Sequence, residues 1–414
     1  MLIAIIDCNN FYVSCERVFQ PKLAKTPIAI LSNNDGCIIA RSNEVKKLGI
    51  PMGAPYFKHK ELLERQNIQI FSSNYTLYGD ISARVMEIVK ELCYEVEIYS
   101  IDEAFFSLDG IKDPLAFCKK VQKALLKWVG IPVSIGIAPT KVLAKIANRK
   151  AKTTPSTKGI YFLQDDSFLK SLPVEEVWGV GGRLSKKLKA LQIFTAYELK
   201  KADPFFLKKK FSVLVERIIH ELNGTSCIPL EVNYQKRKSL VVSRSFGAPL
   251  TSLEDLQEAL ANYVCKACHK LRKEKQMAKH MGVFLHTNLH AKNKTPYYKQ
   301  IQVTFSYHTD NTFSVLKASM EALQKIYLPG LFYVKTGILL SDLVDTHDEP
   351  QDLLDQRDRK KTRQILKALD QVNQKYGKNT ITPARCFGKQ KYGIKAEHQS
   401  PRFTTHFEEL LTVR

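Results

Sequence analysis

The sequence predicts a multidomain α+β protein, and three observations support that fold class. The chain has 414 residues, which is too many for one small core. Strand-like and helix-like segments alternate before Pro173, and the pattern is then helical to about Leu230. Strands separated by helices return between about Leu240 and Leu343. We therefore expect two to four domains.

The first region begins with a buried strand at Leu2–Asp7, and a helix is expected within Asn9–Phe19. Apolar residues at helical spacing predict a helix at Tyr78–Leu92. Asn34-Asp35-Gly36 is a turn signal, and Gly49 ends a helix expected at Ala40–Leu48. The other expected elements are strand Ile28–Leu31, a strand or strand pair at Glu97–Phe106, helix Pro114–Val129, strand Val133–Ile137 and helix Lys141–Lys150.

The later region is predicted to contain four strands and two helices. The strands are Leu240–Phe246, Met281–Thr287, Ile301–Phe305 and Tyr333–Leu340, and the helices are Leu253–Lys275 and Thr312–Tyr327. Asp348–Lys361 is dense in charge and is expected to be a linker.

The net charge of +22 predicts a polyanionic partner, with nucleic acid the first candidate and an anionic membrane the second. No basic amphipathic helix or lipidation signal favours a membrane, and no apolar run reaches the ~18 residues that span one. We expect a cytoplasmic protein. The basic excess is concentrated in Gln235–Gln300, which carries few acids. The basic residues in that stretch are Lys236, Arg237, Lys238, Arg244, Lys266, Lys270, Arg272, Lys273, Lys275, Lys279, Lys292, Lys294 and Lys299.

The nine cysteines are scattered and odd in number, which does not indicate a disulfide scaffold. Cys265 and Cys268 form a lone C-x-x-C. Since a zinc site needs a second pair nearby, we interpret His269 and His280 as surface residues on a helix.

Three carboxylates are the candidate catalytic residues. Asp7 ends a hydrophobic strand, and Asp102 and Glu103 are adjacent within an apolar run. Neighbouring acids resist burial unless a cation compensates them. Divalent ions such as Mg²⁺ prefer carboxylate oxygens, so the pattern predicts a two-metal phosphoryl-transfer site. Unrelated acids in a surface turn are the alternative.

Two sets of residues are candidate phosphate binders. Arg41, Lys46 and Lys47 lie on one expected helix, and Lys152 follows another. Solvated lysines are the alternative for both. The glycine-containing turn at Val177–Leu188 opens a basic helix and can offer backbone N–H groups to a phosphate, although it can equally be a simple turn between helices.

Several collinear motifs together resemble one family. They are Asp7-Cys8-Asn9-Asn10-Phe11-Tyr12-Val13-Ser14-Cys15-Glu16, Ser32-Asn33-Asn34-Asp35-Gly36-Cys37, Tyr99-Ser100-Ile101-Asp102-Glu103-Ala104-Phe105, Gly136-Ile137-Ala138-Pro139-Thr140-Lys141, Ala144-Lys145, the turn at Val177–Leu188 and Arg244-Ser245-Phe246-Gly247. With their spacing, these motifs resemble the Y-family of DNA polymerases over nearly the whole chain, as far as about Leu343. Within that family the chain resembles the branch of UmuC, the catalytic subunit of DNA polymerase V, and its plasmid-borne relatives.

The resemblance implies a right-hand polymerase that performs error-prone translesion synthesis in the DNA damage (SOS) response. The implied domains are a palm at residues 1–20 and 78–170, fingers at 21–77, a helix-hairpin-helix thumb at 171–232, a little finger at 240–345, and a C-terminal linker and tail at 346–414.

The resemblance also implies roles for individual residues. Asp7, Asp102, Glu103 and the backbone carbonyl of Cys8 would hold two Mg²⁺ ions. Tyr12, with Phe11 beside it, would be the steric gate against ribonucleotides, and Lys46 and Lys152 would meet the triphosphate. Gly179, Gly181, Lys186, Arg244 and Ser245 would contact the primer–template DNA. Gly36, Cys37 and Ala40 would lie near the nascent base pair. Ala40 and Asn43 replace the Thr and Tyr that are usual in the family.

Partners are implied in the same way. The resemblance implies a processed UmuD-like protein and a RecA-like recombinase filament. Gln351, Leu353 and Leu354 distantly resemble a sliding-clamp peptide, with an ordinary linker as the alternative. Two other functions stay open. A nucleotide cyclase shares the paired acids but does not need the glycine-containing turn, whereas a DNA-binding scaffold does not need the three acids.

Overall fold

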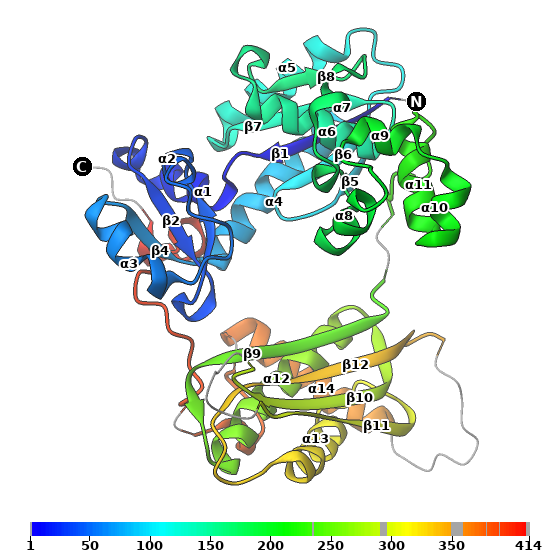
Figure 1. Cartoon of the computed structure of the whole chain (residues 1–414). Coiled ribbons are helices and arrows are strands. Elements are labelled where there is room, and N and C mark those ends of the chain that lie inside the picture. The colour runs from blue at the N-terminus through cyan, green and yellow to red at the C-terminus, as the bar shows by residue number, and fades with distance from the viewer. Residues whose placement is uncertain are drawn as a thin grey trace. The chain divides into compact units, whose positions relative to one another are not determined.

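The computed structural model describes residues 2–233, 236–289, 296–348, 359–377, 379–388 and 390–410 (Figure 1). The chain divides into two compact units. Unit 1 comprises residues 1–234 and 397–414, and unit 2 comprises residues 235–396. No helix among the described residues is both long and apolar enough to cross a bilayer.

Unit 1 is built on a five-stranded sheet in the order β5-β6-β1-β7-β8. Its strands are β1 (Ile3–Cys8), β5 (Tyr94–Ile98), β6 (Glu103–Ser107), β7 (Val133–Ala138) and β8 (Ile160–Phe162). The central strand β1 is antiparallel to β6 and β7. Ile3 and Ile5 belong to one core, whereas Ala4 and Ile6 belong to another. Burial on both faces explains the continuous apolar run at the N-terminus.

The helices around this sheet largely match the expected ones. They are α1 (Phe11–Phe19), α4 (Tyr75–Leu92), α5 (Pro114–Val129) and α6 (Lys141–Thr153). The Thr140 hydroxyl caps the start of α6 by accepting a hydrogen bond from the Leu143 N–H at 3.3 Å. Gly136 of β7 allows α6 to pack closely, since a Cβ there would lie 2.1 Å from the Asn148 nitrogen.

A smaller sheet corrects one prediction. Its strand order is β3-β2-β4, with β2 at Ile28–Leu31, β3 at Ile38–Arg41 and β4 at Gln69–Ser72. The helix expected at Ala40–Leu48 is wrong in its first part, because Ala40 and Arg41 pair with β2. Only α2 (Asn43–Lys47) is helical there, and α3 (Tyr56–Arg65) follows. The sheet pairing outweighs the local helical pattern.

Short helices complete unit 1. They are α7 (Ser167–Ser171), α8 (Gly182–Lys189), α9 (Ala196–Lys201), α10 (Pro204–Lys210) and α11 (Val213–Leu222). A capping box between Thr195 and Glu198 begins α9. The 3₁₀ turns of the described chain are Pro21–Leu23, Asn33–Asp35, Pro155–Thr157, Val174–Glu176, Ala384–Cys386, Phe403–Thr405 and Phe407–Glu409.

Unit 2 contains an antiparallel sheet in the order β11-β10-β12-β9. Its strands are β9 (Ser239–Leu250), β10 (Gln276–Thr287), β11 (Tyr298–Thr309) and β12 (Tyr333–Asp345). The helices α12 (Leu253–Lys273) and α13 (Thr312–Ile326) share its core. All four strands were predicted, although each is longer than expected.

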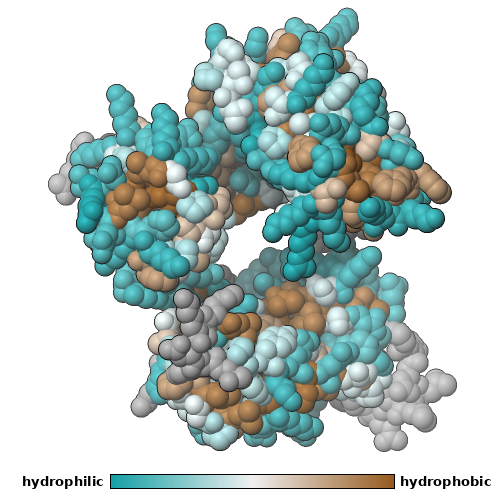
Figure 2. Space-filling view, in the orientation of Figure 1, coloured by the Kyte–Doolittle hydropathy of each residue, from teal (hydrophilic) through white to brown (hydrophobic). Residues whose placement is uncertain are grey.

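A further helix, α14 (Arg359–Tyr376), also belongs to unit 2. The guanidinium of Arg272 on α12 holds it through Asp370, with the Nε to Oδ2 distance 2.6 Å and the Nη2 to Oδ1 distance 2.9 Å. Hydrophilic residues cover most of the face of both units seen in Figure 2, as the net charge of +22 leads one to expect.

Candidate active site

The strand register brings the three candidate acids together. Asp7 on β1 stands opposite Glu103 on β6. Asp102 directly precedes β6, and its carbonyl accepts a hydrogen bond from the Cys8 N–H at 2.9 Å. The end of one strand and the beginning of its neighbour therefore bring the backbones of the three acidic residues and of Cys8 together.

Two lysines of α6 pair with these acids. The Lys152 ammonium forms an ion pair with Asp7, and the Lys145 ammonium lies 2.9 Å from Glu103 Oε1. Residues 145 and 152 are seven apart, about two helical turns, so they share one face of α6. Ser100 Oγ donates to Asp102 Oδ1 at 2.7 Å. Each acid thus has a polar partner from the protein.

The pKa of Asp7 reflects burial first and the neighbouring negative charges second. Burial raises it to about 6, Lys152 opposes that rise, and the charges of Glu103 and Asp102 add to it. Burial, followed by the same three acids, also raises the pKa of the Cys8 thiol. A carboxylate whose charged form is disfavoured despite a lysine partner can gain from a further cation.

The donor chemistry fits a divalent ion. Carboxylate and carbonyl oxygens, with no sulfur or imidazole required, are the ligands that Mg²⁺ prefers. In the described part of the chain, no three His, Cys, Asp or Glu side chains are already arranged around one point. Asp7 and Glu103 are instead turned to Lys152 and Lys145.

A second group of cations lies beside the acids. Lys46 donates to Asn10 Oδ1 at 2.5 Å. Burial lowers the pKa of Lys46, the positive charges of Arg41 and Lys152 lower it further, and Asp7 opposes them. Cations close enough to perturb one another form a site that an anion such as a phosphate would stabilise.

Tyr12 belongs to an aromatic cluster near the same acids. Its ring stacks on Tyr78 with centroids 4.4 Å apart and planes 15° apart, and Tyr75 meets it edge-on at 6.0 Å. Burial, then Tyr75 and Asp102, raise the pKa of Tyr12. Phe11 is buried beside it, whereas Tyr12 stays partly exposed.

The glycine-containing turn is also formed. Gly179 has φ +92°, and a Cβ there would lie 2.8 Å from Ile218 Cδ1, so this position requires glycine. Gly181 is the N-cap of α8, and Lys186 is exposed on that helix. The turn leaves its backbone accessible at the start of a basic helix.

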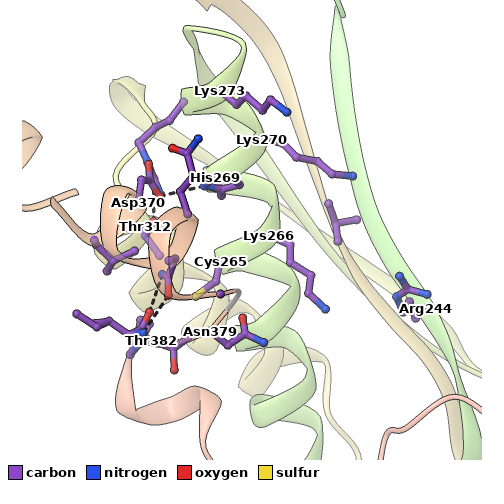
Figure 3. Close-up of a pocket in the computed structure, with 18 of the residues that line it drawn as sticks. Arg244, Cys265, Lys266, His269, Lys270, Lys273, Thr312, Asp370, Asn379 and Thr382 are labelled. Carbon is purple, nitrogen blue, oxygen red and sulfur yellow. Dashed lines mark hydrogen bonds and ion pairs between the residues drawn. The ribbon is translucent and has the colours of Figure 1, made fainter. Parts of the chain in front are cut away.

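Unit 2 contains a basic cavity of about 1110 Å³ (Figure 3). Arg244 of β9 and three exposed lysines of α12 contribute its positive charge, namely Lys266, Lys270 and Lys273. Asp370 is the acid among the described lining residues, and Arg272 and His269 already engage it. Ser245 follows Arg244 on β9 and is exposed, although it does not line the cavity.

Sequence reasoning missed the partners of the predicted residues. Lys145 was noted only as part of a motif, yet its spacing from Lys152 could have indicated a shared face. Asn10, with φ +47°, gave no signal for its contact with Lys46. The predicted clamp residues Gln351, Leu353 and Leu354 lie outside the described residues.

Family models match most of the chain. The model of the impB/mucB/samB family matches residues 6–149, and the model of that family's C-terminal domain matches residues 237–353. A helix-hairpin-helix (HHH) motif of the IMS family matches residues 166–193. Residues 363–413 match a domain of unknown function, DUF4113.

Curated relatives align over the full length. The chain is 40% identical to protein UmuC of Salmonella typhimurium, and the alignment covers 100% of both chains. It is 38% identical to protein MucB of Escherichia coli, with 99% of each chain covered. A DNA polymerase IV of Bacillus velezensis is 27% identical over 93% of each chain.

Solved structures share the fold. A Y-family DNA polymerase chimera of Dbh and Dpo4 aligns with a TM-score of 0.68 and 18% identity, covering 83% of this chain and 100% of the other. An insertion ternary complex of Dbh DNA polymerase aligns with a TM-score of 0.57 at the same identity and coverage.

Proposed function

We infer that this chain, which belongs to the impB/mucB/samB family in the UmuC branch of the Y-family DNA polymerases, is an error-prone translesion DNA polymerase. It adds deoxynucleotides to a primer on a damaged template. The observation that carries this proposal is that Asp7 of β1 stands opposite Glu103 of β6, with Asp102 directly before β6. The cations Lys46, Arg41 and Lys152 lie close to Asp7.

Asp7, Asp102, Glu103 and the Cys8 carbonyl would hold two Mg²⁺ ions. When bound, such ions lower the pKa of the attacking primer hydroxyl and stabilise charge on the leaving pyrophosphate. Asp7 and Glu103 supply the negative charge that attracts the ions. Because Lys152 and Lys145 form ion pairs with these two acids, the charge of both acids is compensated before a metal ion binds.

Lys46, Arg41 and Lys152 would hold the triphosphate. Lys152 forms an ion pair with Asp7. We propose that the Lys152 side chain moves to contact a phosphate oxygen when the nucleotide binds. Asn10 keeps the Lys46 side chain in place for the same purpose. This exchange keeps the local charge nearly balanced before and after binding.

The DNA would be held through its backbone. The exposed turn with Gly179, Gly181 and Lys186 is suited to a phosphate of the primer–template. The cations of unit 2, including Arg244 and its neighbour Ser245, are suited to a longer stretch. In this scheme unit 1 supplies the palm (1–20, 78–170), fingers (21–77) and thumb (171–232), and unit 2 includes the little finger (240–345).

The fingers loop would allow distorted templates. Gly36, Cys37 and Ala40 follow the turn at Asn33–Asp35, and their small side chains would press little on the nascent base pair. We expect synthesis opposite a damaged base at a rate much closer to that on intact template than a replicative polymerase shows. A complete block at an abasic site with all partners present would contradict this.

Partners complete the proposal. A processed UmuD-like protein, a RecA-like filament and a sliding clamp are expected from the branch, with action on cytoplasmic, nucleoid DNA during the SOS response. If Gln351, Leu353 and Leu354 form a clamp peptide, replacing both leucines with Ala should lower clamp-stimulated synthesis only. Equal loss without the clamp would refute the assignment.

The test is primer extension by the purified full-length protein with Mg²⁺, deoxynucleotides and a primed template, with and without EDTA. We expect template-directed extension that EDTA abolishes and added Mg²⁺ restores. Formation of a cyclic nucleotide without primer extension would favour a cyclase. Binding of DNA with no extension under any partner combination would favour a scaffold.

A further inference from the structure

The C-terminal segment of the chain returns to unit 1 and is anchored there by hydrogen bonds. His398 and Ser72 exchange two of them, since the Ser72 N–H donates to the His398 carbonyl at 2.9 Å and the His398 N–H donates to Ser72 Oγ at 3.0 Å. Thr404 Oγ1 donates to Asp80 at 2.7 Å, and Phe403 stacks on Phe19 at 4.7 Å. The segment is thus bound along its length.

Ser400 is a buried, hydrogen-bonded residue of this segment. It is 6% exposed, and its hydroxyl donates to Glu16 Oε1 at 3.0 Å. The same hydroxyl accepts from Asn74 Nδ2 at 3.0 Å, and that amide also donates to the Pro401 carbonyl at 3.0 Å. Asn74 caps α4 with its side-chain oxygen, so one residue links the helix start to the segment.

Glu16 connects Ser400 to the aromatic cluster. Its side chain is fully buried, and the Tyr78 hydroxyl donates to the same Oε1 at 2.7 Å. Tyr78 is itself fully buried and stacks on Tyr12 at 4.4 Å. Ser400, Glu16, Tyr78 and Tyr12 therefore form one continuous series of direct contacts within unit 1.

The segment also holds the fingers loop. The Glu397 N–H donates to Asp35 Oδ2 at 2.9 Å. Asp35 is buried in the left-handed conformation with φ +49°, directly before Gly36. A backbone conformation of this kind needs support from its surroundings, and this contact supplies part of it.

We propose that the segment Glu397–Thr405 positions the nucleotide pocket, and that Ser400 acts on the steric gate Tyr12 through Glu16 and Tyr78. Ser400 is a positioning residue, since its side chain contacts Glu16 and Asn74 and would act on the pocket through them. The inference rests on the proposed polymerase function and on the steric-gate role that the family resemblance implies for Tyr12. It also gives a role to part of the region that matches a domain of unknown function.

The physical reason is the cost of a buried carboxylate. Glu16 Oε1 receives both hydroxyl donors, whereas Glu16 Oε2 is buried without a partner among the described residues. Loss of the Ser400 donor leaves Tyr78 as the remaining donor to this carboxylate, and the carboxylate then shifts or draws in water. Because Tyr78 is bonded to Glu16 and stacked on Tyr12, such a shift moves the gate.

The test is single-nucleotide insertion kinetics with matched deoxy- and ribonucleotides, using the full-length protein with its partners. Ser400→Ala should raise the ratio of ribonucleotide to deoxyribonucleotide efficiency by several-fold, since about 1 Å of misplacement can change rates on the order of 10²-fold. Tyr78→Phe keeps the stacked ring but removes the hydroxyl, and it should reproduce the effect. Ser400→Thr retains a hydroxyl at this position and should therefore retain the selectivity of the unsubstituted protein.

Two further variants make the result specific. Thr404→Ala removes a comparable hydrogen bond from the same segment, the one to Asp80, and should leave the ratio unchanged. Tyr12→Ala removes the ring of the proposed steric gate and should raise the ratio most. Thermal unfolding of each variant shows whether it is folded.

The outcomes separate the two levels of the proposal. If Tyr12→Ala changes the ratio but Ser400→Ala and Tyr78→Phe do not, the positioning role is overturned and the gate stands. If Ser400→Ala and Thr404→Ala change the ratio equally, the effect comes from docking of the whole segment, and the specific role of Ser400 is overturned. If Tyr12→Ala leaves the ratio unchanged, the gate assignment fails, and the inference built on it fails as well.

Discussion

Two basic helices, α6 in unit 1 and α12 in unit 2, use their lysines differently. On α6 three lysines face three acids on three neighbouring strands: Lys141 pairs with Glu97 of β5, Lys145 with Glu103 of β6 and Lys152 with Asp7 of β1. On α12 the lysines that line the cavity are Lys266, Lys270 and Lys273. Arg272 of the same helix forms a close ion pair with Asp370, at 2.6 Å from Nε to Oδ2.

The difference separates two kinds of ligand. Compensated charges suit a ligand that brings cations and anions together, as a magnesium–nucleotide complex does, because the acids and lysines can exchange partners. An excess of positive charge suits a polyanion that brings no cation of its own. Single substitutions among the acids and lysines at α6 should therefore change the rate of the chemical step. DNA binding by the cavity beside α12 should instead depend on the salt concentration.

The largest expected effect follows from removing an acid of the first site. Asp7→Ala should lower the rate of nucleotide addition by roughly 10³-fold or more, because the charge that holds metal is lost. DNA affinity, measured by fluorescence anisotropy, should change little. Glu61→Ala removes an exposed acid of α3 as a control. Substantial primer extension by Asp7→Ala protein would end the assignment.

The second prediction concerns the helix α12. Replacing Lys266, Lys270 and Lys273 together with Gln should weaken DNA binding by about 10-fold near physiological salt and lower the salt slope by up to ~3. Insertion at saturating DNA should be unchanged. A matched control replaces three exposed lysines of α5 with Gln, namely Lys119, Lys120 and Lys123. An unchanged salt slope would show that DNA does not use the cavity.

The third prediction returns to α6. Lys152→Ala should raise the KM for the incoming nucleotide by roughly 10-fold, since a phosphate contact worth about 1.4 kcal/mol is lost. The apparent affinity for Mg²⁺ should not fall, because Asp7 loses a competing partner. Lys150→Ala, on the same helix but over Tyr161, is the control. A changed kcat with an unchanged KM would contradict the triphosphate role.

In both units, sequence patterns predicted the helices and strands better than they predicted the contacts between those helices and strands. Pro114–Val129 and Ile28–Leu31 were predicted with the observed bounds, because apolar spacing and proline position are local signals. The strand β3 was missed at Ala40, since its pairing partner lies elsewhere in the chain. The pairing of Lys145 with Glu103 and the bond from Ser400 to Glu16 join residues 42 and 384 positions apart, and local patterns carry no such information.

The smallest expected effect concerns Asp370 of α14, which forms an ion pair with Arg272 of α12. Burial alone would raise the pKa of Asp370, but hydrogen bonds from Arg272 and His269 outweigh burial and hold that pKa below its ordinary value. The charged form is therefore favoured in the folded state. The resulting stabilisation is complete above the ordinary carboxyl pKa of about 3.9 and is lost as the pH falls through the lowered pKa.

Asp370→Asn should accordingly lower the opening free energy of α14 by about 1–2 kcal/mol at pH 7, measured by hydrogen exchange of its amides. The difference from the unsubstituted protein should begin to shrink below the ordinary carboxyl pKa of about 3.9 and should disappear as the pH falls through the lowered pKa of Asp370. As a control, Asp345→Asn breaks the more exposed ion pair between Asp345 and Lys236. This substitution should lower the free energy of unfolding by less than about 0.5 kcal/mol. A difference that stays constant down to pH 3 would mean that the packing of α14, rather than the charge of Asp370, holds the helix against α12.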